Sequence, residues 1–137
     1  MPMTALTFPA KFDYLDEIRD FVGDQARASG FNERDIYSIQ LAADEAATNI
    51  IEHACDGIPE ASFELTCDFK KDRLVITFFD HGKSFDPSKV AQPDIKADLS
   101  DRKIGGLGIF LMRKLMDEVR YEITPSGNLL TLVKRKG

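Results

Sequence analysis

Two pairs of short apolar runs, each joined by a tight polar turn, most constrain what this chain can fold into. The turns read Lys70-Lys71-Asp72 and Pro125-Ser126-Gly127. The four runs that flank them are residues 62–69, 74–79, 119–124 and 128–134. Strands joined by such short turns pair antiparallel as hairpins. The sequence therefore predicts an antiparallel sheet built largely from two hairpins.

Helical periodicity fills most of the remaining chain. Apolar residues recur at helical spacing from Phe12 to Ser29, and Gly30 then ends that helix. Asn32 is a candidate N-cap for a second helix that runs to about Ala54, and a third helix is expected from Gly106 to about Asp117. A short edge strand is expected from Thr4 to Phe8, before these helices.

These elements predict an α+β fold. Hairpin strands pair antiparallel, and the helices beside them must cover one face of the sheet. We therefore expect a two-layer α/β sandwich with helices on one face of a mixed, mainly antiparallel sheet. The sequence has no internal repeat, so the 137 residues are expected to form one domain, 1–137.

The composition excludes several classes of protein. Lys plus Arg number 18 and Asp plus Glu number 23, and a net charge of −5 gives no basic surface for nucleic acid. No apolar stretch approaches the ~18 residues of a membrane span, and the first residues carry no export signal. Cys55 and Cys67 form no metal cluster, and two free thiols predict a cytoplasmic location. The basic end Lys134-Arg135-Lys136 is expected to guard an edge strand with charge.

Glu45 and Asn49 lie four residues apart and so stack on one face of the second helix. Periodicity favours the interpretation that this face is simply solvated, because the apolar residues lie on the opposite side. The alternative is an oxygen-rich site. Asn49 would give its side-chain oxygen to Mg²⁺, and Glu45 would accept a proton from water or from a hydroxyl nucleophile.

Asp80-His81-Gly82 ends the apolar run at residues 74–79. Asp and Gly are common in turns, so an ordinary strand-to-turn transition is one interpretation. The functional alternative is that Asp80 accepts a hydrogen bond from an adenine amino group while Gly82 lets the base approach the backbone. Guanine presents an oxygen acceptor at the same position, so such a site would reject it.

Gly105-Gly106-Leu107-Gly108 leads into the third helix. Glycines permit a tight backbone, and a helix N-terminus points free amides at an anion. A flexible hinge is the alternative, but these glycines follow a long charged loop, His81 to Lys103, which favours closure over phosphate. The chain has no Walker A motif, and Leu111 breaks a GxGxxG match.

The order of these three motifs resembles the GHKL (histidine-kinase-like) ATPase superfamily, and the short chain resembles its anti-sigma factor serine/threonine kinase branch. Residues 41–54 and 105–119 carry most of the resemblance, which covers almost the whole chain. The resemblance implies ATP and Mg²⁺ as cofactors, an antagonist protein as the phosphorylated partner, a sigma factor as the regulated partner, and a homodimer.

The resemblance also implies roles for single residues. Glu45 would be the general base that activates a serine or threonine hydroxyl of the partner. Asn49 would hold Mg²⁺, and Asp80 would bind the adenine amino group with Gly82 beneath the base. The other implied nucleotide-binding residues are Phe85, Arg102, Lys103, Gly105, Gly106, Leu107 and Gly108, with a lid from about Phe85 to Gly105.

One position departs from the family pattern. Several members carry an arginine directly before the glycine pair, where this chain has Ile104 and places its basic residues at Arg102 and Lys103. Phosphoryl transfer depends on neutralising charge on the transferring group. Two functions therefore remain: a protein serine/threonine kinase, or an ATP/ADP-binding regulatory module that controls partner binding without significant transfer.

Overall fold

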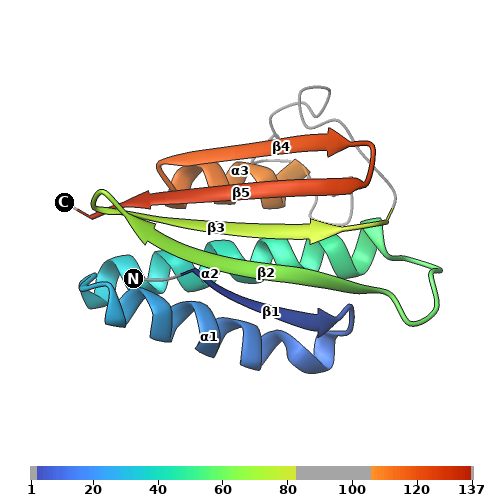
Figure 1. Ribbon diagram of the computed structural model, residues 1–137, viewed down its shortest axis with the longest axis horizontal. Helices are drawn as coiled ribbons and strands as arrows, with labels where there is room; N and C mark the ends of the chain where they lie inside the picture. The colour runs from blue at the N-terminus through green and yellow to red at the C-terminus, as the bar shows by residue number, and fades with distance from the viewer. Residues whose placement is uncertain (1–2, 83–105, 137) are drawn as a thin grey trace.

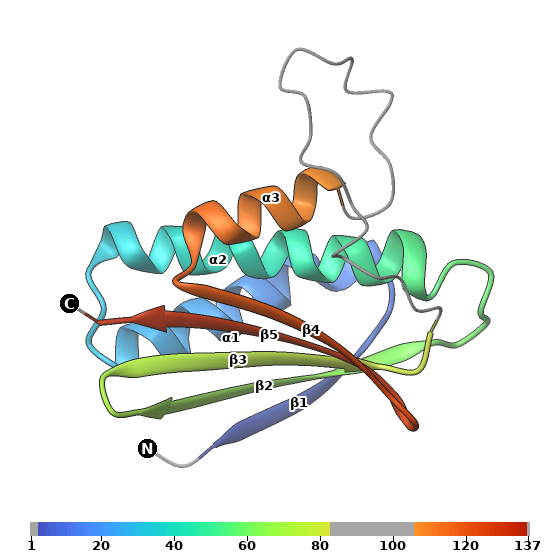
Figure 2. The same ribbon diagram turned by 90° about the horizontal axis from the view of Figure 1, so that it is seen from above.

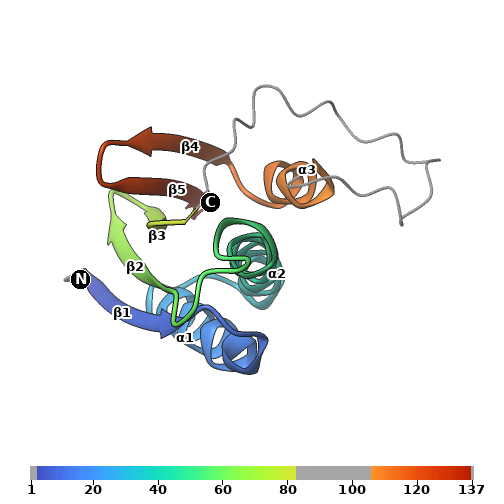
Figure 3. The same ribbon diagram turned by 90° about the vertical axis from the view of Figure 1, so that its right-hand side faces the viewer.

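A curved five-stranded sheet carries three α-helices on its inner face in the computed structural model, which describes residues 3–82 and 106–136 (Figure 1, Figure 3). In chain order the elements are β1 (Thr4–Pro9), a 3-10 turn η1 (Phe12–Tyr14), α1 (Leu15–Ala28), α2 (Glu33–Asn49), a π-helical segment η2 (Ile50–Ala54), β2 (Ser62–Lys70), β3 (Arg73–Asp80), α3 (Gly106–Leu115), β4 (Glu118–Thr124) and β5 (Gly127–Arg135).

The strands lie in the order β1-β2-β3-β5-β4, and every neighbouring pair is antiparallel. The expected α+β sandwich is thus confirmed, and so are both hairpins. The parallel pair that a mixed sheet would need is not found among the described strands. In Figure 3, β1 lies at the end of the sheet beside α1, and β4 lies at the end beside α3.

Local sequence signals account for the end of the first helix and the start of the second. Gly30 ends the first helix with φ of +90°, a left-handed conformation that costs glycine little. Asn32 caps α2, because its side-chain oxygen accepts a 2.8 Å hydrogen bond from the Asp35 backbone N–H. Both expectations from the sequence are confirmed.

Periodicity predicted that the second helix continues to about Ala54, but its α-helical part ends at Asn49. Its last five residues, Ile50–Ala54, form a π-helical turn in which the Cys55 N–H donates to the Ile50 carbonyl at 2.8 Å. Such turns widen a helix and are frequent at functional sites. Ile50 and Ala54 both remain buried, so the wider turn keeps their side chains in the core.

The core fills the space between the sheet and the three helices. Alternate residues of β2, β3 and β5 point inward, as the two-residue period of a strand requires. The largest fully buried side chains include Phe63, Leu65, Ile76, Phe78, Met112 and Leu132. They meet buried alanines on the inner face of α2, whose small side chains let that helix lie close to the sheet.

The last strand, β5, lies between β3 and β4, so the basic end of the chain does not guard an edge. The expectation was wrong because the β4–β5 hairpin enters the sheet with its second strand inward. Lys134 instead donates from Nζ to the Leu115 carbonyl at 2.8 Å, at the C-terminal end of α3. A cation there stabilises the carbonyl end of the helix dipole.

No helix within residues 3–82 and 106–136 has the length and apolar character needed to cross a membrane.

Candidate functional site

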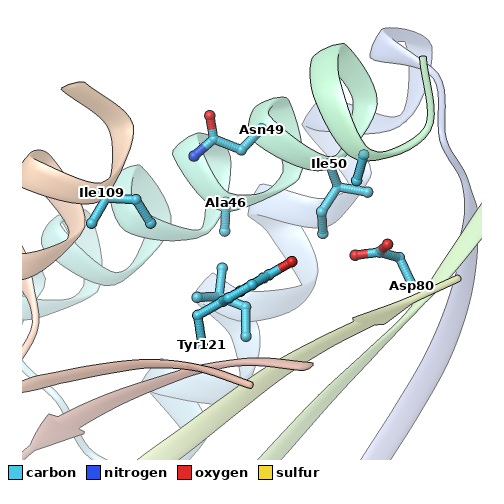
Figure 4. A pocket seen from close by; sticks show the side chains of 8 residues that line it. Ala46, Asn49, Ile50, Asp80, Ile109 and Tyr121 are labelled. Atoms are coloured by element: carbon cyan, nitrogen blue, oxygen red, sulfur yellow. The ribbon is translucent and has the colours of Figure 1, made fainter. Parts of the chain in front are cut away.

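A pocket opens where the end of α2 and its π-helical turn face the sheet and α3 (Figure 4). The space between its lining atoms amounts to about 320 Å³, a figure that includes open solvent at its mouth. The residues that line it are Ala46, Asn49, Ile50, Ala54, Asp80, Ile109, Tyr121 and Leu130. Most of these side chains are apolar, and a few polar groups converge among them, which is typical of a small-molecule site.

Asn49 is brought into this pocket from α2, and α3 packs against it. Its Nδ2 atom is buried and has no hydrogen-bond partner among the described residues. A Cβ atom added at Gly108 would lie 2.7 Å from that nitrogen, so only glycine leaves room for the carboxamide. The interpretation of this helix face as simply solvated is therefore wrong for Asn49, because α3 covers it.

The first turn of α3 lies next to this carboxamide. The helix begins at Gly106 and runs beside α2 (Figure 2), and Gly108 in its first turn meets Asn49. Backbone N–H groups at the start of a helix have no acceptor within the helix and favour anions. The start of a helix and a buried amide are thus neighbours, although they come from distant parts of the sequence.

Asp80 enters the pocket from the end of β3. It is 3% exposed, and its Oδ1 atom accepts hydrogen bonds from the Gly82 N–H at 2.8 Å and from Asn128 Nδ2 at 2.9 Å. Burial and, second, the charge of Asp80 raise the pKa of the nearby Cys55 thiol to about 11. The carboxylate is therefore fixed in place at the pocket, and its charge acts on the neighbouring thiol.

Gly82 lies against the π-helical turn. A Cβ atom at this position would be 2.1 Å from the Ala54 carbonyl oxygen, so the backbone of residue 82 needs glycine to pass. The sequence predicted that Gly82 makes room for a base. The structure gives an additional reason, since the two backbones are in close contact where Asp80 turns out of the sheet.

The structure gives less detail about the remaining predicted site residues. Glu45 is half-buried on α2, one turn before Asn49, and it does not line the pocket. Gly106 and Leu107 open α3. Phe85, Arg102, Lys103 and Gly105 lie outside the described residues, as does the whole predicted lid from about Phe85 to Gly105.

Tyr121 and Asn128 were not predicted from the sequence. Tyr121 in β4 lines the pocket, and Figure 4 shows its hydroxyl directed toward Asp80. Asn128 in β5 is 1% exposed and bonds to Asp80. Asparagine is uncommon in strands, so Asn128 within the apolar run 128–134 was a signal that could have been read.

The pocket can offer Mg²⁺ an oxygen ligand from a carboxamide side chain. The described residues contain no cluster of three or more His, Cys, Asp or Glu side chains that could hold a metal ion. An all-protein cage is therefore absent from this part of the chain. A carboxamide such as that of Asn49 can supply one oxygen to Mg²⁺, which keeps several waters and takes further ligands from phosphates.

Comparison with known proteins agrees with this arrangement. The sequence profile of the family described as histidine kinase-like ATPase domain matches residues 8–134. The serine-protein kinase RsbW of Halalkalibacterium halodurans is 36% identical over 135 residues, which span 94% of this chain and 80% of that protein.

Solved structures show the same fold. The RsbU and RsbW domains of a Mycobacterium tuberculosis protein superpose with a TM-score of 0.70 at 17% identity, over 98% of this chain and 32% of that one. The catalytic domain of histidine kinase ThkA gives 0.58 at 16% identity over 99% of both chains. On the family match and the sequence identity to RsbW, this chain belongs to the histidine kinase-like ATPase family and, within it, to the serine-protein kinases of the RsbW type.

Proposed function

We propose that this protein is an ATP-dependent serine/threonine protein kinase that acts as an anti-sigma factor-type regulator and phosphorylates an antagonist protein. The observation that carries the proposal is the convergence of Asn49, Asp80 and the first turn of α3 around one pocket. Membership of the RsbW-type kinases supports serine as the phosphorylated residue. ATP use follows from the family, and the assignment of single residues is our proposal.

Adenine recognition is assigned to Asp80. An amino group donates to a carboxylate, whereas the guanine oxygen would face it acceptor to acceptor. The bonds to Gly82 and Asn128 both end on Oδ1, so Oδ2 is the oxygen we assign to the base. Ile50, Ile109 and Leu130 supply the apolar walls beside it.

Phosphate binding is assigned to Asn49 and to the backbone amides of Gly106 and Gly108. Asn49 would hold Mg²⁺, which when bound neutralises charge on the phosphates. The buried Nδ2 of Asn49 would gain a partner once a phosphate oxygen fills the space beside it. Phe85, Gly105 and Leu107 remain proposed nucleotide contacts, and Arg102 and Lys103 would add positive charge.

Glu45 is assigned the general base. The hydroxyl oxygen of the partner attacks the terminal phosphorus of ATP while Glu45 accepts the hydroxyl proton, the bond from that phosphorus to the bridging oxygen breaks, and ADP leaves. Glu45 lies one turn before Asn49 on the same helix, so a rigid element fixes the separation of base and phosphate ligand.

The biological setting follows from the same proposal. We propose one ATPase domain over residues 1–137, which works as a homodimer, binds a sigma factor and an antagonist protein, and binds neither nucleic acid nor membrane. Two buried free thiols, Cys55 and Cys67, suit the reducing cytoplasm.

Replacing Glu45 with Gln tests the proposal. The variant should bind MgATP as tightly as the wild type, because the charge of Glu45 is used on the hydroxyl proton. Phosphate transfer to an antagonist protein encoded beside the kinase gene should fall by about a hundredfold or more, the usual contribution of a general base. Calorimetry measures the binding, and labelled ATP measures the transfer.

Glu52→Gln is the matched control, since Glu52 is an exposed carboxylate on the π-helical turn beyond Asn49. It should transfer phosphate at the wild-type rate. Unchanged transfer by Glu45→Gln would remove Glu45 as the base. Nucleotide binding by the wild type without any transfer would favour the regulatory binding module, and a wild type that binds no nucleotide would refute the proposed function.

A further inference from the structure

We propose that Asn128 is a positioning residue for nucleobase selection, and that it acts by fixing the Asp80 carboxylate in the orientation that accepts from adenine. This inference rests on the proposed adenine site. It concerns a residue that touches Asp80 rather than the base.

Asn128 uses both hydrogens of its amide nitrogen on the Asp80–Gly82 segment. Nδ2 donates to Asp80 Oδ1 at 2.9 Å and to the Gly82 carbonyl at 3.0 Å. The Gly82 N–H donates to the same Oδ1 at 2.8 Å. Asp80 Oδ1 is therefore held by two donors, and rotation of the carboxylate would break both bonds.

The turn that carries Asn128 is itself fixed to the same segment. Asp80 and Asn128 are paired in the register of β3 and β5. A Cβ atom at Gly127 would lie 2.4 Å from the Asp80 carbonyl oxygen, and His81 Nδ1 lies 2.6 Å from the Ser126 carbonyl oxygen. Residues 126–128 thus contact residues 80–82 at several points, and Asn128 cannot move away without disturbing the strand pair.

A neutral donor at position 128 has a chemical consequence. Asp80 must stay an ionised acceptor to distinguish an amino group from an oxygen. An amide donates to the carboxylate without adding charge of its own. A carboxylate at position 128 would instead face Asp80 with like charge, and two adjacent carboxylates titrate with one pKa raised.

Asn128→Asp is the test, because it keeps the shape of the side chain and removes the donor. Binding of ATP is compared with that of purine riboside triphosphate, which lacks the amino group but has the same ribose and phosphates. At about pH 8 the variant should lose the preference for ATP by about tenfold or more, the effect of one hydrogen bond to a charged group. The analogue should bind nearly as it does to the wild type.

The pH dependence separates positioning from a general loss of structure. At about pH 6 one proton shared between Asp80 and the new Asp restores a donor, so the preference for ATP should partly return. Among the described residues, the ionisable groups near Asp80 are Cys55, Tyr121 and His81, and all are present in the wild type, whose profile serves as reference. Ratios of two nucleotides also cancel the titration of their phosphates.

Asn128→Thr provides a second variant if Asn128→Asp does not fold. Its hydroxyl offers one donor without charge, so its preference for ATP should be intermediate and should not change with pH. Thr131→Val is the control, because Thr131 is also buried in β5 but lies on the opposite face of the sheet, and it should keep the full preference.

These measurements distinguish failure of the role of Asn128 from failure of the proposed function. If the wild type prefers ATP over the analogue and Asp80→Asn abolishes that preference, the adenine site stands. A folded Asn128→Asp variant that keeps the full preference at about pH 8 would then overturn the role of Asn128 alone. A wild type without any preference would refute the adenine site itself.

Discussion

A substitution at Gly108, which contacts Asn49, should change nucleotide affinity without changing the stability of the fold. A methyl group at position 108 would lie 2.7 Å from the end of the Asn49 side chain, which can rotate away. Alanine also favours a helix over glycine by about 1 kcal/mol. Gly108→Ala should therefore leave the free energy of unfolding within about 1 kcal/mol of the wild type. Affinity for MgATP should fall by about tenfold, because the carboxamide is displaced from the pocket.

Gly82→Ala is the matching substitution with the opposite expectation. Its methyl group would meet the Ala54 carbonyl oxygen at 2.1 Å and the Ala54 carbonyl carbon at 2.5 Å, and both are backbone atoms. The variant should lose about 1–3 kcal/mol of stability, the range for a forced backbone shift. Urea denaturation measures the stability of both variants and calorimetry the binding. If Gly108→Ala binds MgATP normally, the Asn49 carboxamide does not act from the place the structure gives it.

Among the elements, the β2–β3 hairpin holds a local conflict between sequence and conformation. Lys71 and Asp72 form its two-residue loop with φ of 53° and 60°. Two positive φ values match a type I′ turn, in which Asn and Gly are preferred. The double substitution Lys71→Asn and Asp72→Gly should raise the free energy of unfolding by about 1 kcal/mol.

The comparison is Ser126→Gly in the loop of the β4–β5 hairpin, because Ser126 is not in the left-handed region. Glycine there should not stabilise the fold, and it should lower the free energy of unfolding by up to about 1 kcal/mol, because it raises the entropy of the unfolded chain. Urea denaturation at neutral pH compares the variants, and an equal change at both turns would contradict the argument from backbone conformation.

The local sequence pattern was enough to predict the elements, but it could not predict which elements lie next to one another. Periodicity predicted the helices and both hairpins, and Asn32 predicted its own capping bond. The place of β5 inside the sheet depends on how the second hairpin docks, which no run of residues encodes. The π-helical turn was missed for a related reason, since Ile50 and Ala54 fit an apolar stripe in either helix type.

At the scale of the whole molecule, the pocket exists because separate segments meet. Residue type and order in the sequence indicate Asn49, Asp80 and Gly108 as site residues, and the structure brings them to one place. Tyr121 and Asn128 belong to a hairpin in which Tyr121 is usual for a strand, and the unusual asparagine by itself names no neighbour. Their roles arise only from the face of β4 and β5 that turns toward α2, so long-range packing had to be known first.

The two buried thiols link the whole fold to pH. Burial raises the pKa of Cys67 to about 12, and burial together with the Asp80 charge raises that of Cys55 to about 11, from an ordinary value of 9.0. Above about pH 9 the unfolded chain loses thiol protons that the folded protein keeps, so stability should fall as pH rises from about 9 to about 11. Each thiol contributes at most about 1.4 kcal/mol per pH unit to this slope.

Urea denaturation in reducing buffer across this range measures the effect. The double variant Cys55→Ala and Cys67→Ala starts from a lower stability, because it loses buried sulfur atoms. Its stability should nevertheless decline less steeply with pH, since every other ionisable group is common to both proteins. Parallel slopes would mean that the thiols ionise as readily in the folded protein as in the unfolded chain, and that solvent reaches Cys67 in β2 and Cys55 at the end of the π-helical turn.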